Sequence, residues 1–423
     1  NALVGWASGG PAKVAVVSSA LCGMVSGSSV GNTVTTGSVT IPMMKKTGYP
    51  PEFAGAVEAA SSTGGQIMPP IMGAAAFIMA EMTGYEYSDI IVRAILPAFL
   101  YFLGIFLGVH FKAKKLGLVG LKREELPKWK LLLPKIYLLL PLIILTWMVI
   151  AGQTMAKSAI YGTIVAIVVG IINKDDRMTP TKFVNGLENG GKNCLSIGIA
   201  CGIAGIISVC ITMTGLGGKL ITYVVKLSNG HLFIALFLTM ICCIILGMGV
   251  PTTANYIIMA STCAPILING MGMHILAANM FVFYFGIVAD ITPPVALAAY
   301  AGAAIAKAPP MKTALNATRL AIAAFIIPYI FAYNNAMIFV GDVTFFGVAS
   351  IVISATLGMA SIASGFMGYL IHDLKWYSRI ALIAGGLLMV IPGTVTDLAG
   401  LAILIVILLI QRAENKKEKK AAV

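Results

Sequence analysis

Long apolar runs dominate the chain, and their lengths set the first prediction. Continuous apolar stretches cover Ile90–Phe111, Leu131–Ile150 and Leu398–Ile410. A helix needs about 20 apolar residues to cross a hydrocarbon layer of about 30 Å, and these stretches reach or approach that length. We therefore predict an all-α, polytopic membrane protein.

Basic residues gather in a few short segments between the apolar runs. Seven Lys and Arg residues lie in Lys112–Lys130, and five more lie in the C-terminal tail. Because Lys and Arg cross membranes poorly, we place these segments in the cytoplasm. Ile90–Phe111 then runs inward and Leu131–Ile150 outward. Ser158–Ile172 returns to a polar cytoplasmic loop, Asn173–Lys192, which could include an interfacial helix.

The C-terminal part is predicted to add further spans. Met311–Tyr333 and Thr344–Ile371 form an outward and inward pair. Ile380–Ile410 is interrupted at Pro392-Gly393 and forms either two spans or a re-entrant pair. Asp397 lies near this interruption, and we expect it to face the outer surface.

Two apolar hairpins are too short and too rich in glycine to be ordinary pairs of spans. Each consists of two apolar arms joined by a tip of small and hydroxyl-bearing residues. The tips are Ser26–Ser29 and Gly247–Thr253, and the arms are Pro11–Val25, Asn32–Met44, Leu232–Leu246 and Asn255–Ile268. Such tips expose unpaired backbone groups at membrane depth, which is tolerated only where protein or a water-filled cavity satisfies them.

One interrupted helix follows each hairpin. The first, Glu52–Met82, breaks at Gly64–Pro70, and the second, Met273–Ala306, breaks at Asp290–Pro294. Consecutive prolines remove backbone donors and push the preceding residue out of helical geometry. We therefore predict true breaks rather than bends.

The two hairpin units match at a nearly constant spacing, which indicates an internal repeat. The pairs Asn32/Asn255, Ser38/Ser261 and Pro42/Pro265 are 223 positions apart, and the pairs Gly48/Gly272, Pro69/Pro293 and Pro70/Pro294 are 224 apart. Lysines 45 and 46 place the open end of the first hairpin inside, and lysine 307 places the end of the second broken helix inside. The copies are therefore predicted to be inverted. Paired broken helices in an inverted repeat indicate a transporter site near the bilayer midplane.

This pattern divides the chain into four parts. Residues 1–89 hold the first hairpin and its broken helix, and residues 229–310 hold the second. Residues 90–228 form scaffold helices with a cytoplasmic connection, and residues 311–423 form a C-terminal transmembrane extension. Since spans precede the second unit but not the first, symmetry predicts about three further helices upstream of Asn1.

Composition supports the membrane class and argues against two others. Of 423 residues, 58% are hydrophobic and 11% are charged, with a mean hydropathy of +0.92, so the charges are too few to cover a soluble surface. The net charge of +13 comes from short loop segments, which disfavours nucleic acid as a partner. The seven cysteines and four histidines show no metal-ligand spacing, and no nucleophile elbow or phosphate loop is present.

The tips and breaks carry the candidate chemistry. Helices are expected to begin near Ser28–Asn32 and Thr252–Asn255, and a helix N-terminus carries a partial positive charge that attracts anions. The preceding arms end in free carbonyls, which together with hydroxyls and amides form oxygen-only cages suited to sodium. Single Ser and Thr residues in membrane helices usually have packing roles. Their recurrence in two matched copies favours a site.

Two acids lie near the breaks. Asp290 directly precedes the second break, and Glu58 lies one to two turns before the first. A charge at membrane depth is costly unless it is functional, paired or solvated. Asp290 is a candidate sodium ligand, proton carrier or helix cap. For both acids a purely structural role stays open.

At the two hairpin and double-proline units, the chain resembles the large membrane subunit of tripartite ATP-independent periplasmic (TRAP) transporters. The resemblance runs from about residue 11 to 310 and rests on Ser26–Ser29, Gly37–Pro42, Gly64–Pro70 and Thr292–Pro294. The strings Glu58–Pro70 and Ala289–Pro294 are most similar to the fused TAXI-type branch, in which the small and large membrane subunits share one chain. The spans after Met311 also resemble that branch.

The resemblance implies a sodium-driven, elevator-type importer in a bacterial or archaeal cytoplasmic (inner) membrane. It implies Na+ as the coupling ion and a small organic acid as substrate, such as a dicarboxylate, a sugar acid or a glutamate-like compound. The implied partners are a periplasmic solute-binding protein and a small membrane subunit fused upstream.

By motif position, the resemblance also implies ligands from both tips and both breaks. The expected substrate contacts are Ser28, Ser29, Asn32, Thr33, Gln66, Thr252, Thr253 and Asn255. The expected sodium ligands are Ser29, Asn32, Gly64, Pro69, Thr253, Asn255, Asp290 and Thr292. The second tip departs from the Gly-Ser-Ser pattern of the first, so the assignments there are less specific.

Two other functions are considered. An ion channel or passive anion facilitator could be built on the same re-entrant hairpins, but a channel requires a continuous polar stripe, whereas these tips are localised. An intramembrane enzyme would need a paired acid or a Ser-His arrangement, and Asp290 and Glu58 lie in different copies. We predict that the chain is not an enzyme.

Overall fold

A computed structural model describes residues 5–120, 133–173, 177–341, 343–390 and 393–421. Within these ranges all regular secondary structure is helical, and one isolated bridge joins Tyr369 and Asp373. The predicted all-α class is confirmed. The basic residues Lys122, Arg123, Lys128 and Lys130, and also Pro392, lie outside the described residues.

The first hairpin unit forms four helices, which we call the first copy. They are α1 (Gly10–Ser26), α2 (Ser29–Lys46), α3 (Pro51–Gly65) and α4 (Gly73–Thr83). Gly27 takes a left-handed conformation with φ 62° at the tip, which favours glycine. Ser28 then caps α2, because its hydroxyl accepts the Gly31 N–H at 3.2 Å.

The second hairpin unit repeats this order, and we call it the second copy. It comprises α11 (Leu232–Gly247), α12 (Thr252–Thr262), the π-helical turn η3 (Ile266–Gly270), α13 (Ile275–Val288) and α14 (Leu297–Ala306). Met72 and Ala296, 224 positions apart, both have positive φ, and both Pro-Pro bonds are cis. The internal repeat predicted from residue spacing is therefore present in the backbone.

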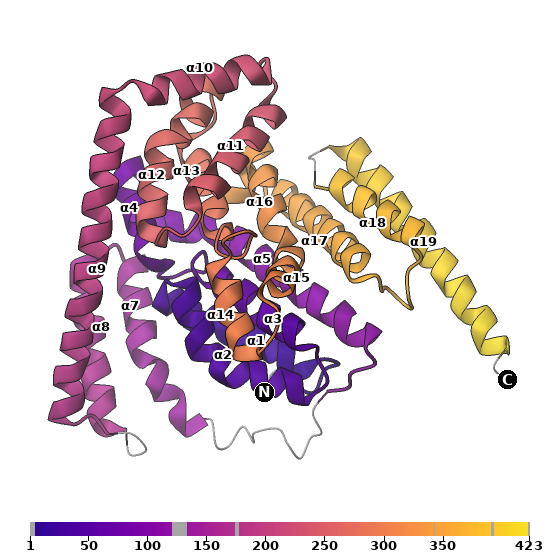
Figure 1. The fold of residues 1–423 in the computed structure, drawn as a ribbon, viewed down its shortest axis with the longest axis horizontal. Coiled ribbons are helices and arrows are strands. Elements are labelled where there is room, and N and C mark those ends of the chain that lie inside the picture. Colours follow the sequence, from indigo (N-terminus) through magenta and orange to yellow (C-terminus); the bar gives the residue numbers. More distant parts are fainter. Residues whose placement is uncertain (1–4, 121–132, 174–176, 342, 391–392, 422–423) are drawn as a thin grey trace.

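The two copies run in opposite directions. Figure 1 shows α3 low and α4 high, whereas α13 lies high and α14 low. The copies also interlock, since α14 packs on α2 and α3 while α4 packs on α12 and α13. Glycines permit the closest crossing: a Cβ on Gly55 would lie 2.9 Å from the Gly302 carbonyl oxygen. The broken helices form the centre, and every residue from Phe53 to Gly65 is buried.

The segment between the copies is helical throughout most of its described length. It contains α5 (Tyr87–Lys115), the 3-10 helix η2 (Leu133–Leu139), α7 (Leu140–Ile150), α8 (Met155–Ile172), α9 (Pro180–Met213) and α10 (Leu216–Ser228). Of the two alternatives for residues 173–192, a polar loop or a segment with a helix, residues 180–192 are helical and form the start of α9. Thr179 precedes Pro180 and accepts the Lys182 N–H at 3.3 Å, so a capped helix begins there and meets no later proline.

The C-terminal extension forms the remaining helices. They are α15 (Pro310–Leu320), α16 (Ile322–Tyr333), the 3-10 helix η4 (Asn335–Ile338), α17 (Phe345–Met367), α18 (Trp376–Leu388) and α19 (Thr394–Ala421). The stretch 380–410, which was predicted to be interrupted, therefore lies in two helices, α18 and α19. Asp397 differs from the prediction, because it is half-buried and accepts a hydrogen bond from Ser354 Oγ of α17 at 2.5 Å.

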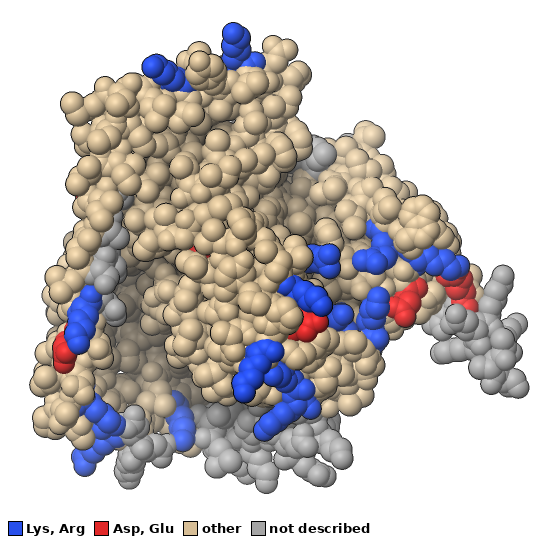
Figure 2. Space-filling model, in the orientation of Figure 1, with Lys and Arg blue, Asp and Glu red and all other residues tan. Residues whose placement is uncertain are grey.

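Helix lengths fit a multi-pass membrane protein. Four helices in the described ranges are long and apolar enough to span a bilayer: Tyr87–Lys115, Pro310–Tyr333, Phe345–Met367 and Val395–Glu414. Shorter apolar helices, including the first arm of each hairpin, accompany them. Figure 2 shows few charges over the middle of the visible face and most Lys and Arg side chains toward its lower part. The polytopic membrane class is confirmed.

Candidate functional site

A hydrogen bond joins the first tip to the second break. Ser29 is the first residue of α2 and is 2% exposed, and Asp290 follows the end of α13 and is 8% exposed. The Ser29 hydroxyl donates to Asp290 Oδ2 at 2.5 Å, across 261 positions of sequence. The predicted site residues of the two copies therefore meet at this point.

Gln66 occupies the first-copy position that corresponds to Asp290, since 66 plus 224 is 290. Its side chain is buried, and its amide oxygen has no hydrogen-bond partner among the described residues. The amide lies near the Asp290 carboxyl group. An unpaired buried amide oxygen is costly, which marks this position as one where a ligand would be stabilised.

The two matched asparagines brace the copies in different ways. Asn32 Nδ2 donates to the Ser19 carbonyl of α1 at 2.9 Å. Asn255 Nδ2 donates to the Gly286 carbonyl of α13 at 3.0 Å. Both side chains are buried, and Asn255 Oδ1 has no partner among the described residues. These contacts tie each second arm to its own copy.

A close approach of small residues recurs beside both asparagines. A Cβ on Gly23 would lie 2.7 Å from Gly65 Cα and 2.9 Å from Asn32 Nδ2. At the matched position, a Cβ on Gly247 would lie 2.8 Å from Asn255 Nδ2 and 3.0 Å from the Cβ of the alanine before Asp290. The first arm of each hairpin therefore touches the end of the first half of its broken helix. This contact was not predicted from the sequence, although the two glycines, Gly23 and Gly247, are 224 positions apart and could have indicated it.

Several predicted site hydroxyls bond to their own helix. Thr33 Oγ1 donates to the Ser29 carbonyl at 2.8 Å, and Thr292 Oγ1 donates to the Val288 carbonyl at 2.8 Å. Ser28 is exposed and caps α2. Such backbone bonds are the usual use of Ser and Thr in membrane helices. In this conformation these three residues support the tips and breaks rather than face a shared cage.

The remaining predicted residues belong to the second tip and the first break. Thr252 and Thr253 are half-buried on the first turn of α12. Gly64 faces the ring of Tyr101, whose hydroxyl donates to the Ala60 carbonyl at 2.7 Å. Pro69 forms the cis bond of the first break. Gly64 is thus a packing position in α3.

Glu58 lies in a hydroxyl cluster that the sequence analysis did not identify. Its carboxyl group is fully buried in α3 and accepts hydrogen bonds from Ser19, Thr36, Thr40 and Ser62. Thr36 and Thr40 are four apart on α2, and Glu58 and Ser62 are four apart on α3, so two faces with matching polarity were visible in the sequence. The partner Ser19 lies too far away in sequence to be inferred.

Buried oxygen atoms from both copies are candidate ligands for a hard cation. The Asp290 carboxylate, the amide oxygens of Gln66 and Asn255, and the Ser29 hydroxyl are all buried oxygens. Oxygen ligands suit hard cations. Neither of the two amide oxygens accepts a hydrogen bond from a protein group among the described residues. In the described residues no group of three or more His, Cys, Asp or Glu side chains could hold a metal ion, so a transition metal does not fit.

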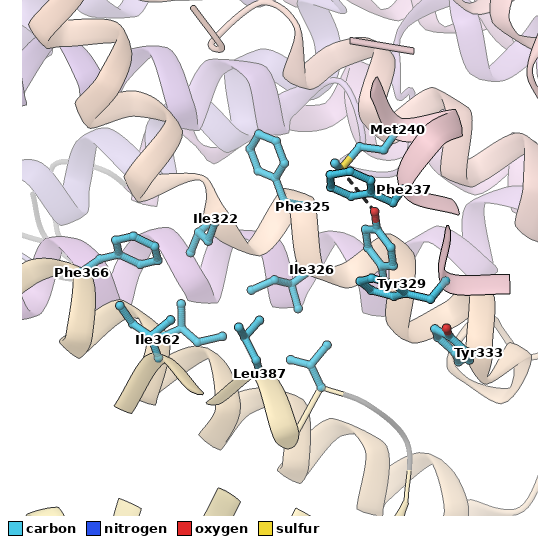
Figure 3. Close-up of a pocket in the computed structure, with 13 residues that line it drawn as sticks. Phe237, Met240, Ile322, Phe325, Ile326, Tyr329, Tyr333, Ile362, Phe366 and Leu387 are labelled. Carbon is cyan, nitrogen blue, oxygen red and sulfur yellow. Dashed lines mark hydrogen bonds between the residues drawn. The ribbon is translucent and has the colours of Figure 1, made fainter. Parts of the chain in front are cut away.

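A large cavity lies elsewhere in the fold. It has a volume of about 700 Å³ and lies between α11, α16, α17 and α18. Figure 3 shows aromatic and aliphatic side chains around it, with a hydrogen bond from the Tyr329 hydroxyl to Met240 Sδ at 3.4 Å. None of the predicted site residues lines it. Since its lining is aromatic and aliphatic and includes no Lys or Arg, it is not our candidate site for an organic anion.

Three curated relatives show similarity to parts of the chain. A protein of Sinorhizobium fredii named only as uncharacterised protein y4mL is 39% identical over 92 residues, which is 22% of this chain and 22% of that relative. The C4-dicarboxylate TRAP transporter large permease protein DctM of Pseudomonas aeruginosa is 24% identical over 315 residues, covering 73% of this chain and 72% of the relative. The protein of that name from Vibrio cholerae is 29% identical over 129 residues, covering 30% and 27%.

The family comparison covers more of the chain than any of these three relatives. Residues 1–346 match the family described as tripartite ATP-independent periplasmic transporter, DctM component. The match includes both hairpins, both broken helices and the Ser29–Asp290 junction. This chain therefore belongs to the DctM-component family of tripartite ATP-independent periplasmic transporters, a family of transporter permeases and not of enzymes.

Proposed function

We propose that this chain carries out sodium-coupled secondary uptake of a small organic anion. The observation that carries the proposal is the Ser29–Asp290 hydrogen bond, which joins two inverted copies where the helices of both are interrupted. Inverted broken helices supply positive N-terminal ends for an anion and free carbonyls for a cation at the same depth.

The proposed substrate is a C4-dicarboxylate or a glutamate-like acid. Two relatives carry C4-dicarboxylate in their names. In this chain α2 and α12 begin at the tips, and α4 and α14 begin just after the breaks, so four helix N-termini lie near the junction. Backbone N–H groups at such ends bind carboxylates without a buried Arg.

The proposed coupling depends on charge compensation at the junction. Asp290 and the carboxylate of a substrate would repel one another at close range in a medium of low dielectric constant. Sodium, when bound, supplies the positive charge that lets both carboxylates occupy one site. Ser29 orients Asp290, while Gln66 and Asn255 present neutral oxygens on opposite copies.

An elevator-type movement is proposed for the translocation step. The interlocked helices α2, α3 and α14 on one side, and α4, α12 and α13 on the other, support movement of both copies as one unit. The surrounding helices, including α5 and α7 to α10, would form the scaffold. A substrate held at the junction would then cross with the unit.

The proposed partners and location follow the family. A periplasmic solute-binding protein would deliver the substrate, and a small membrane subunit, proposed to be fused upstream as in the TAXI-type branch, would complete the scaffold. The complex would reside in a bacterial or archaeal cytoplasmic membrane.

Uptake in proteoliposomes tests the proposal. The complex is reconstituted with its binding protein, and radiolabelled succinate and glutamate are supplied under an inward sodium gradient. We expect saturable uptake that stops when the sodium gradient is collapsed by an ionophore. Uptake that proceeds equally without any ion gradient, and never exceeds the external concentration, would instead support a passive facilitator.

A further inference from the structure

Glu58 has an environment that the proposed sodium junction does not explain. Its side chain is fully buried in the middle of α3, where hydroxyls from three helices surround it. Oε1 accepts from Ser19 of α1, from Thr36 of α2 and, at 3.3 Å, from Ser62 of α3. Oε2 accepts from Thr40 of α2. We call these five side chains the Glu58 cluster.

No cation accompanies this carboxyl group among the described residues. No ion pair to Glu58 is present in these ranges, and the titratable side chain beside it is Cys22 of α1. The helices α5, α14 and α15 also pack on α3, but no described interaction joins Glu58 to their charged side chains. A buried carboxylate without a cation is disfavoured, so binding of a cation or a proton would stabilise this group.

The hydroxyls can satisfy Glu58 both with and without a proton. When the group is ionised, the four hydroxyls donate to it. When a proton from water is on Oε2, that O–H donates to Thr40 Oγ1, and the Thr40 hydroxyl donates instead to the Thr36 carbonyl 3.1 Å away. Thr36 likewise has an alternative acceptor, the Asn32 carbonyl at 2.7 Å. Rotation of hydroxyls is therefore enough to take up or release a proton.

The spacing of the cluster favours a proton over a metal ion. The four hydroxyls are in direct hydrogen-bond contact with the two carboxyl oxygens, so a sodium ion would have to separate them. A proton needs no such displacement. The second copy has no equivalent, because the matched position, 58 plus 224, is the buried Val282. The cluster is thus an addition to the paired tip and break sites rather than part of them.

Two hydrogen bonds connect the cluster to the first tip. Ser19, which donates to Glu58, also accepts from Asn32 Nδ2 through its carbonyl. Thr36 donates either to Glu58 or to the Asn32 carbonyl. Ser19 and Thr36 therefore link Glu58 to Asn32, three residues beyond Ser29.

We propose that the Glu58 cluster is a proton-binding site that exchanges one proton with water during transport. The proton binds when the first copy faces one side of the membrane and is released on the other, separately from the sodium junction at Asp290. This inference rests on the proposed transport function, but proton binding itself can be measured without transport.

Infrared difference spectroscopy of the purified full-length protein tests proton binding directly. The wild type is expected to show the carbonyl band of a protonated carboxyl group, which disappears as pH is raised. The band should be lost in Glu58→Gln and retained in Asp290→Asn and in Glu81→Gln, an exposed acid on α4. Retention of the whole band in folded Glu58→Gln, or its absence from the wild type at every pH, would overturn the proposal.

Proteoliposome uptake of succinate under separate sodium and proton gradients tests the coupling. The wild type is expected to be stimulated by an inward proton gradient, and Glu58→Gln is expected to lose that stimulation while the response to sodium persists. Equal stimulation of both proteins by protons would overturn the coupling role. If the wild type moves no substrate under any gradient, the proposed function fails, while the infrared result still decides whether Glu58 binds a proton.

Discussion

Ser29, at the tip of the first hairpin, donates a hydrogen bond to Asp290, the acid at the break of the second copy. Its hydroxyl is the donor to a carboxylate that is almost completely buried, and hydrogen bonds to charged groups are worth about 1.5–3 kcal/mol. Beside this contact, Gln66 and Asn255 have amide atoms with no partner among the described residues. The junction is thus a set of polar groups that a ligand can complete.

Ser29→Ala should weaken sodium activation of uptake. Loss of a charge-assisted hydrogen bond predicts that the half-activating sodium concentration rises by about tenfold or more, since about 1.4 kcal/mol corresponds to a factor of ten. Ser38→Ala removes an exposed hydroxyl from the same helix and is the matched control. An unchanged sodium response in Ser29→Ala would exclude this contact from coupling.

Asn32→Ala and Asn255→Ala should each weaken sodium coupling more than they lower the amount of folded protein. Each removes one neutral hydrogen bond, which contributes only about 0.5–1.5 kcal/mol to stability, but each also removes an oxygen from the candidate cage. Uptake at limiting sodium and folded yield by size-exclusion chromatography give the comparison. Normal transport by both variants at limiting sodium contradicts the assignment.

The sequence indicated individual candidate residues more readily than the contacts that they make. Ser29 and Asp290 were both predicted, because a hydroxyl at a tip and an acid before a double proline are visible locally. Their pairing was not predictable, because these two residues are 261 positions apart and meet only through the packing of the two copies. Asn32 and Asn255 were expected to be equivalent, yet they bond to α1 and α13 respectively. Packing decides which neighbouring carbonyl each amide meets.

At the scale of elements, the small residues at the hairpin arms set how closely the helices approach. Gly23 of α1 lies against Gly65 of α3, and Gly55 of α3 lies against Gly302 of α14. Small residues let membrane helices pack backbone to backbone, where dispersion contacts and polar bonds replace the hydrophobic effect. These contacts fix the positions of the tips relative to the breaks.

Gly23→Ala should destabilise the protein. The new methyl group would lie 2.7 Å from Gly65 Cα, so the backbone must shift, and overpacking of this kind costs about 1–3 kcal/mol. Gly186→Ala in α9 has open space around its Cβ and is the control, for which helix propensity predicts no loss. Thermal unfolding in detergent measures both. A Gly23→Ala midpoint equal to the wild type would show that the arm has room to move.

Element boundaries followed the local signals where these were strong. The double prolines correctly predicted both breaks, and the small residues at the tips correctly predicted both hairpins. The signal was weaker at residues 180–192, where polar composition indicated a cytoplasmic loop that could include a helix, and the lack of a proline after Pro180 allowed α9 to continue. Polarity along a chain reports solvent exposure more directly than it reports backbone conformation.

At the scale of the molecule, the two copies are inverted relative to each other. This inversion brings two breaks of opposite direction to one depth, and it lets α14 pack on α2 and α3 while α4 packs on α12 and α13. The residue spacing and the lysine distribution predicted this arrangement, because repeats and loop charges are properties of sequence alone. The contacts that the C-terminal extension makes with the rest of the protein, such as that of α17 with α5, were indicated neither by a repeat nor by loop charges.

Single-cysteine accessibility tests the inversion most directly. Cysteines replace Lys46, Glu86, Asn229 and Lys307 in a cysteine-free background, and all four positions are exposed at the ends of helices. A membrane-impermeant maleimide is applied to oriented vesicles. Labelling of Lys46→Cys and Lys307→Cys from the cytoplasmic face, and of Glu86→Cys and Asn229→Cys from the opposite face, is the predicted result. Labelling of Lys46→Cys and Asn229→Cys from the same face would mean that both hairpins enter from one side, which contradicts the account.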